Sequence, residues 1–178
     1  MIRNITALVI LISSLYRCYN PGPYSYDRYY VPLEEEKRYK EAITPPYAEV
    51  KRQPDQYKDK LIAWFGVVKK IEDRNGKTVI YLSHRIHIKR HLCADETRAS
   101  CRVTVSEKSR GDFIAYVKLK DKDRRGPNSV QPLSLLRIIG RFKGEFDPKG
   151  DPILEAVYYR HWPKGQYVTT KMRRYFRR

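Results

Sequence analysis

The chain has 178 residues, of which 41% are hydrophobic, so its length and composition predict one domain with a buried core. Its 37 Lys and Arg residues exceed its 20 Asp and Glu residues, which gives a formal charge of +17. A mean hydropathy of −0.69 excludes a polytopic membrane protein, and 11 Pro with 9 Gly argue against a helical bundle. The excess positive charge favours an anionic partner.

The N-terminus, residues 1–17, has the organisation of an export signal. Its apolar run, Ile5–Ile12, is shorter than the roughly 20 residues that span a membrane. Leu15 stands three residues before Cys18, as in the lipobox of bacterial lipoproteins, although Tyr and Arg occupy the two positions where small residues are usual. We therefore expect lipidation at Cys18, with an unmodified Cys18 as the alternative.

Residues 18–53 are expected to form a Tyr- and Pro-rich tether that carries a short helix. Three Pro and one Gly within 19–32 oppose regular structure there. A helix is predicted over 33–42, because acidic residues come early in it and basic residues late. Its three consecutive Glu residues, 34–36, are interpreted as a solvated surface.

Residues 54–163 are predicted to form an all-β domain. Apolar and alternating patterns place five strands, at 61–68, 78–82, 113–119, 137–144 and 153–159. Asn75-Gly76 predicts a hairpin between the first two strands, Gly66 permits a bend in the first, and residues 133–136 predict one helical turn. This pattern predicts a small five-stranded Greek-key barrel of the OB-fold type with irregular terminal extensions; an open five-stranded sheet with one helix is the alternative.

The chain has three cysteines, Cys18, Cys93 and Cys101. If Cys18 carries a lipid, Cys93 and Cys101 remain as a pair. An oxidising compartment favours a disulfide between them over two free thiols.

Three histidines, His84, His87 and His91, precede Cys93, and imidazole and thiolate are zinc ligands. The β-branched residues before them favour a strand, on which His84 and His87 would face opposite sides. Interleaved Arg and Lys would repel a cation. We therefore predict neither a metal site nor a cofactor.

The sequence contains no motif of a known catalytic site: no nucleophile elbow, P-loop or Gly-x-Gly-x-x-Gly is present. Ser134 and His161 lack an identifiable third partner, and only convergence in space could supply one. The prediction is a non-enzymatic role.

Basic residues form the main functional signal. Arg137, Arg141 and Lys143 share one face of the fourth predicted strand, and the C-terminal tail, residues 164–178, is rich in cations. The predicted anion-binding residues are Lys118, Lys120, Arg137, Arg141, Lys143, Arg173, Arg174, Arg177 and Arg178. A solvated face that aids solubility is the alternative interpretation.

Several segments resemble the Slp-like outer-membrane lipoproteins, an exported family of the OB type. The resemblance rests on Pro54–Lys60 and the strand ending at Gly66-Val67, Ser109–Phe113, Ile139–Gly144, Gly150–Ala156 and Trp162. Asp59 replaces the Gly that is customary in the family. The resemblance implies a fold and an outer-membrane location, but no catalytic residues.

At a cell envelope, these cations would meet anionic lipid, lipopolysaccharide phosphates, wall polymers or a partner protein. The predicted function is therefore an envelope-anchored protein that binds such material through its basic face and tail. Two alternatives remain: a single-stranded nucleic-acid-binding OB protein, and a structural component of an envelope assembly.

Overall fold

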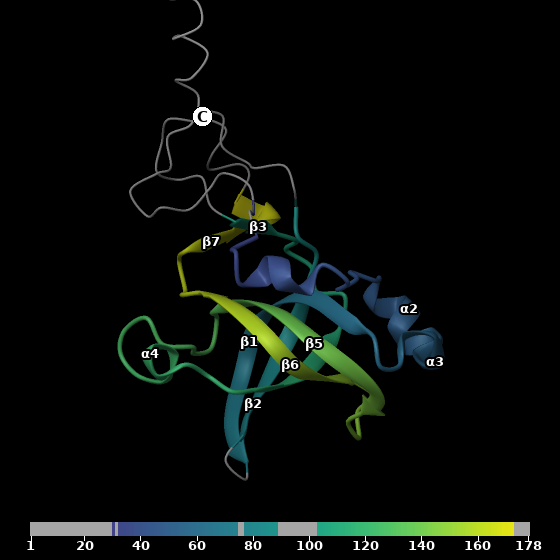
Figure 1. Ribbon diagram of the computed structural model, residues 1–178. Helices are drawn as coiled ribbons and strands as arrows, with labels where there is room; N and C mark the ends of the chain where they lie inside the picture. Colours follow the sequence, from purple (N-terminus) through teal and green to yellow (C-terminus); the bar gives the residue numbers. More distant parts are fainter. Residues whose placement is uncertain (1–29, 31, 75–76, 89–102, 173–178) are drawn as a thin grey trace, which may run out of the picture.

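The computed structural model describes residues 30, 32–74, 77–88 and 103–172 (Figure 1). Strands dominate it, with a few short helices between them. In chain order the elements are η2 (Glu36–Tyr39), α2 (Tyr47–Arg52), α3 (Pro54–Tyr57), β1 (Leu61–Arg74), β2 (Lys77–Arg85), β3 (Val103–Val105), β4 (Asp112–Val117), α4 (Asp121–Arg124), β5 (Leu135–Phe146), β6 (Pro152–Trp162), β7 (Tyr167–Thr169) and η3 (Thr170–Met172).

Five strands form a mixed sheet that closes in a ring, in the order β1-β2-β4-β6-β5. Neighbouring strands are antiparallel except β4 and β6, which pair in parallel through Ile114–Tyr116 and Ile153–Glu155. The closure rules out the open sheet. The hairpin prediction is confirmed by the pairing of Arg74 with Lys77, although the turn itself lies outside the described residues.

Alternation along the strands separates an inner from an outer face, as the sequence predicts. In β5, Leu136, Ile138 and Phe142 face the main core inside the ring. Gly66 of β1 lies so close to β2 and β4 that a Cβ there would stand 2.8 Å from both Leu82 and Phe113. A side chain at this position would therefore push the strands apart.

Apolar side chains from two other regions complete the core inside the ring. Tyr47, Val50 and Tyr57, from α2 and α3, pack into it, as do Leu119 and Val130 from the connection that carries α4. In Figure 1, α2–α3 and α4 lie on opposite sides of the ring. The segment predicted as a tether is thus partly built into the domain.

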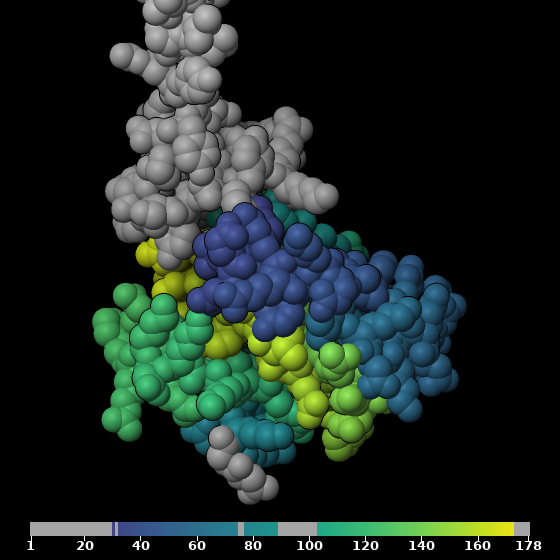
Figure 2. All heavy atoms as spheres, viewed as in Figure 1, coloured from purple at the N-terminus to yellow at the C-terminus, as the bar shows by residue number. Residues whose placement is uncertain are grey.

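The outer face of the ring is also covered. The β3–β7 pair places Val103 and Val105 against Phe65 and Trp162. Residues 39–43 cover β1, β5 and β6 further along, where the Tyr39 hydroxyl donates to the Val157 carbonyl. Figure 2 shows this N-terminal segment, purple to blue, as a layer beside the yellow-green β5 and β6.

Several local predictions were wrong. The helix expected over 33–42 is only the 3₁₀ turn η2. The helical turn expected at 133–136 does not form, because β5 begins within that segment. A helical turn, α4, forms instead in the charged loop before it. The tail predicted to be irregular contains β7 and η3. Glu36, interpreted as solvated, is 4% exposed.

Asp59 adopts a left-handed backbone, with φ of 61°. Glycine adopts this conformation without strain, and Asp is among the few other residues that tolerate it. The backbone N–H of Asp59 donates to the Phe142 carbonyl at 2.7 Å, which fixes the entry into β1. A glycine would therefore suit this position as well.

Candidate functional site

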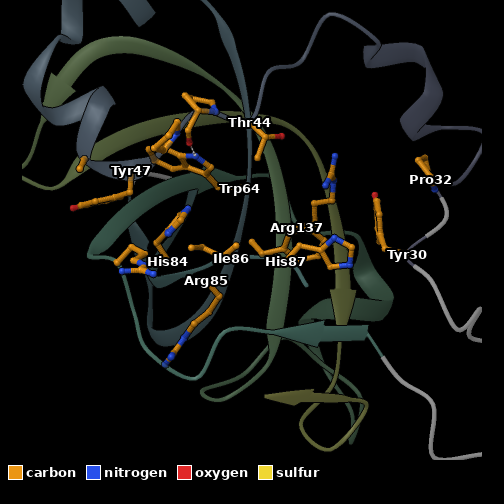
Figure 3. A pocket seen from close by; sticks show the side chains of 15 residues that line it. Tyr30, Pro32, Thr44, Tyr47, Trp64, His84, Arg85, Ile86, His87 and Arg137 are labelled. Carbon is orange, nitrogen blue, oxygen red and sulfur yellow. Dashed lines mark hydrogen bonds between the residues drawn. The ribbon is translucent and has the colours of Figure 1, made fainter. Parts of the chain in front are cut away.

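A groove of about 1080 Å³ lies where the ends of β1 and β2 meet the segment that precedes α2 (Figure 3). Its lining combines aromatic, prolyl and cationic side chains. The lining residues are Tyr30, Pro32, Thr44, Pro45, Pro46, Tyr47, Ala48, Trp64, Phe65, His84, Arg85, Ile86, His87, Arg110 and Arg137.

Hydrogen bonds and one glycine hold the wall formed by residues 44–48. The Trp64 indole donates to the Pro45 carbonyl at 2.8 Å, and the Tyr47 hydroxyl donates to the Asp112 carbonyl at 2.7 Å. The Tyr47 ring lies directly on Gly111, where a Cβ would stand 2.1 Å from a ring carbon. Gly111, with φ of 145°, is thus required both by its backbone conformation and by the ring above it.

His84 is the most deeply buried titratable group of the groove, with 5% of its surface exposed. The ring centroids of Trp64 and Tyr47 lie 5.1 and 5.5 Å from the centroid of its imidazole. Burial, reinforced by the charges of Arg110 and Arg85, lowers the pKa of His84 to about 4, so its ring is neutral at pH 7. Its Nδ1 atom is buried and has no hydrogen-bond partner among the described residues.

The opposite end of the groove is a packed aromatic cluster. Phe65 and His87 stack with centroids 5.0 Å apart, and Tyr30 meets both rings edge-on. The Arg137 guanidinium lies 4.6 Å from the centroid of Tyr30 and forms an ion pair with buried Glu36 at 2.6 Å. Burial, together with the Glu36 carboxylate, raises the pKa of Tyr30.

The charge of the groove is uneven. Among the described residues that line it, none is Asp or Glu. Arg137 is neutralised by Glu36, whereas Arg85 donates to the backbone carbonyls of Ser106 and Glu107 and so keeps its net charge. Arg110 is exposed and makes no ion pair within the described part of the chain. The net positive charge therefore gathers at the end that holds His84.

Most of the predicted anion-binding residues that the structure describes are engaged by the chain itself. Besides Arg137, Lys143 pairs with Asp59 at 3.1 Å, and Arg141 donates to the Asp59 carbonyl at 2.6 Å. Lys120 pairs with Glu35 at 3.2 Å.

Lys118 is exposed and shares a smaller hollow, of about 320 Å³, with Lys120 and Arg38. The tail cations Arg173, Arg174, Arg177 and Arg178 lie outside the described residues, as do Cys18, Cys93, Cys101 and His91. The lipidation and disulfide predictions therefore remain predictions.

A second buried polar cluster joins Ser134, His161, Asp123 and Tyr159. His161 Nε2 lies 3.1 Å from the Ser134 hydroxyl, and its Nδ1 lies 3.5 Å from Asp123. The Tyr159 hydroxyl donates to the same carboxylate at 2.6 Å. The fold thus supplies the third partner that the sequence alone did not identify.

This cluster has the order of a Ser–His–Asp triad but not its accessibility. Ser134 is fully buried and lines neither the groove nor the smaller hollow, so no substrate carbonyl can approach its hydroxyl in this structure. Burial lowers the pKa of His161, although Asp123 opposes the shift. The cluster instead fastens the α4 connection to β6, with Lys120 N–H donating to the Tyr159 hydroxyl at 2.8 Å.

Two of the histidines that were considered as zinc ligands, His84 and His87, lie apart in the described residues. His84 lies among the rings that pack against the main core, whereas His87 stacks on Phe65 in the outer cluster. No group of three or more metal-binding side chains occurs in residues 30, 32–74, 77–88 and 103–172. In the same residues, no helix is long and apolar enough to span a membrane.

Sequence reasoning missed the groove, because its walls come from distant segments. The available signals were Pro45-Pro46-Tyr47, which follow the predicted helix, and Arg110-Gly111, which lie within a segment of the family resemblance. No protein-family model, no curated protein and no solved structure matches the chain.

Proposed function

We propose that this chain is an exported, lipid-anchored binding protein with an OB-type barrel and no catalytic activity, whose anionic ligand occupies the groove. The OB assignment is supported by the order of the ring: taken by sequence, its five strands follow the order 1-2-3-5-4, and the third and fifth close it in parallel. The resemblance to Slp-like lipoproteins agrees with this plan and supports an outer-membrane location.

One observation carries the proposal: the groove combines aromatic walls with a cationic end, and its described lining holds no acidic residue. Concave, mostly apolar sites with a few convergent polar groups are the usual form of ligand sites. Arg85 and Arg110 would attract an anion, and the lack of a neighbouring carboxylate leaves that attraction uncompensated.

The groove is a better candidate than the basic strand face from which the sequence prediction started. There, Arg137 and Lys143 are paired with Glu36 and Asp59, and an incoming anion would have to displace these carboxylates. At the groove, Arg110 has no such competitor among the described residues. The C-terminal cations would add attraction to an anionic surface, at about 1 kcal/mol for each Lys or Arg near it.

Charge reversal at Arg110 tests the proposal. The full-length mature protein is titrated with lipopolysaccharide and with phosphatidylglycerol vesicles, and binding is followed by tryptophan fluorescence, since Trp64 lines the groove. Arg110→Glu is expected to weaken binding at least tenfold, because two units of charge change at the site.

The matched control is Arg125→Glu, which makes the same change of charge at an exposed position beside α4. It is expected to weaken binding much less. Equal effects of the two variants would show that net charge, and not the groove, governs binding. Tight binding of single-stranded oligonucleotide that is insensitive to Arg110→Glu would favour the nucleic-acid alternative.

The exported state is tested separately by the intact mass of the protein from the membrane fraction. A mature chain that begins at Cys18 and carries acyl groups is expected, and Cys18→Ala should abolish the acylation. A soluble product that retains Met1 would contradict export.

A further inference from the structure

The two ends of the groove differ in what they offer a ligand. Figure 3 shows Ile86 near the middle, with His84, Arg85 and Tyr47 toward one end and His87, Arg137 and Tyr30 toward the other. At the second end the Tyr30 hydroxyl and Arg137 Nε are also buried without a well-formed hydrogen bond, but both already face the Glu36 carboxylate, and the rings pack on one another. An anionic group is therefore attracted to the first end, and an apolar group to the second.

Two buried nitrogen atoms at the first end have no hydrogen-bond partner among the described residues: Nδ1 of His84 and Nε of Arg85. They belong to consecutive residues at the end of β2, and His84 is 95% buried because only 5% of its surface is exposed. Consecutive residues of a strand point to opposite faces, so these two atoms would take separate acceptors. Buried polar atoms are normally satisfied, so the Nδ1 atom of His84, on which the charge of Arg110 acts, points to an absent oxygen acceptor. A neutral imidazole that carries its proton on Nδ1 donates one hydrogen bond, and the guanidinium Nε donates another.

The middle of the groove is apolar and open. Ile86 is 41% exposed, and Pro45, Pro46 and Phe65 line the groove with it. An exposed large aliphatic side chain framed by prolyl and aromatic rings favours an apolar occupant.

The lining argues against a glycan. Sugar hydroxyls need many donors and acceptors, but among the described lining residues there is no Asn, Asp, Gln or Glu, and Thr44 supplies one aliphatic hydroxyl. A compact polyanion would use Arg85 and Arg110 but leave the apolar stretch uncovered.

We infer that the ligand is an amphipathic anion. Its carboxylate or phosphate head group lies beside Arg110 and accepts a hydrogen bond from His84, and its hydrocarbon body runs over Ile86 toward Phe65 and Tyr30. This inference rests on the proposed function, since it assigns a ligand class and an orientation to the same groove. The head group has two possible sources, a free fatty acid or a phospholipid.

Four probes that share one hydrocarbon chain or one head group test the inference. They are dodecanoate, dodecyl phosphate, dodecyltrimethylammonium and acetate, with uncharged dodecanol as a fifth probe for the variants, each kept below its micelle concentration or solubility limit and titrated by calorimetry into the full-length mature protein. Dodecanoate and dodecyl phosphate are expected to bind at least tenfold more tightly than the cation of equal chain length, and acetate is expected to bind more weakly still. A preference for the phosphate would point to a phospholipid, and a preference for the carboxylate to a free fatty acid.

Two variants locate the parts of the ligand. Arg110→Met keeps side-chain length but removes the charge, and it should reduce the affinity for dodecanoate about tenfold while leaving that for dodecanol unchanged. Ile86→Ser should weaken dodecanoate and dodecanol alike. Val157→Ser is its control, because Val157 is similarly exposed, at 45%, but lies outside the groove. Circular dichroism confirms that each variant is folded.

The outcomes separate this inference from the proposed function. If Arg110→Glu weakens the binding of lipopolysaccharide but none of the chain-bearing probes binds, the groove is a site for a different anion and only the inference fails. If the cation binds as tightly as dodecanoate, the proposed orientation is wrong. If Arg110→Glu changes no binding at all, the proposed function itself fails.

Discussion

Two buried histidines, His84 and His161, show how the same residue type serves two purposes in this molecule. Burial lowers the pKa of both. His161 uses both ring nitrogens, one toward Ser134 and one toward Asp123. His84 lies between aromatic rings and leaves Nδ1 without a partner among the described residues. A satisfied histidine stabilises the fold, whereas an unsatisfied one beside a groove points to a ligand.

The largest expected difference comes from breaking the His161 cluster. Asp123→Ala removes the acceptor for Tyr159 and the partner of His161, and two buried polar groups left unpaired cost together about 4 kcal/mol of unfolding free energy. Urea denaturation measures the loss. Asp121→Ala, in the same helix but exposed, should stay within about 0.5 kcal/mol of the wild type. Similar losses in the two variants would remove the structural role assigned to the cluster.

The next largest effect is expected from His84, which should lower the free energy of unfolding at acid pH. Its pKa in the folded chain is about 4, below the ordinary 6.5, so the folded state favours the neutral ring. The stability that this provides is present above pH 6.5 and is lost as the pH falls toward 4, which amounts to about 3 kcal/mol. Arg85, Arg110 and the Tyr47 hydroxyl are the charged and titratable groups that face the ring.

The measurement is urea unfolding at pH 7.5 and pH 4 for the wild type and His84→Leu. The variant should lose about 3 kcal/mol less than the wild type between the two pH values. An identical pH dependence would mean that His84 is already protonated, or solvated, in the folded state.

A smaller loss of stability is expected from Ser134→Ala, which tests whether Ser134 has a structural or a catalytic role. Ser134→Ala removes one hydrogen bond to His161 and one from the backbone N–H of Gln131, so we expect a loss of about 1 kcal/mol. Ligand binding in the groove should not change. An esterase activity of the wild type that disappears in Ser134→Ala would contradict the structural interpretation.

The smallest expected effect is a gain. Leu133, next to Ser134, is 51% exposed and has a left-handed backbone with φ of 70°. Leu133→Gly relieves that strain, partly offset by the greater freedom of glycine in the unfolded chain, so the net stabilisation is about 0.5 kcal/mol. Thermal unfolding measures it. A destabilised variant would show that Leu133 makes apolar contacts worth more than the strain.

Local patterns in the sequence predicted most of the sheet. The alternation of Ile138 and Phe142 with Arg137 and Arg141 is correct, because a strand repeats every two residues whatever lies beyond it. The first hairpin follows from an equally local signal. At Gly66 the sequence predicted a bend, whereas the close approach of Leu82 and Phe113 to this glycine depends on how the strands meet.

Features that depend on distant partners could not be predicted. Glu36 is buried because Arg137, a hundred residues away in the chain, neutralises it. The same contact removes Arg137 from the free cations on which the sequence prediction relied. The groove likewise needs Tyr47 and His84 to meet, which only the closed ring brings about.

The parallel contact between β4 and β6 also sets the order in which the chain can fold. The β1–β2 hairpin joins neighbouring residues, whereas Ile114 must find Ile153 across a loop that includes α4 and β5. Closing a long loop costs entropy before its contacts are formed, so this closure is expected late, after the β5–β6 hairpin. Conservative substitutions in the β4–β6 contact should therefore speed unfolding while hardly slowing folding. The β4–β6 contact should thus set how long the native ring persists before it unfolds.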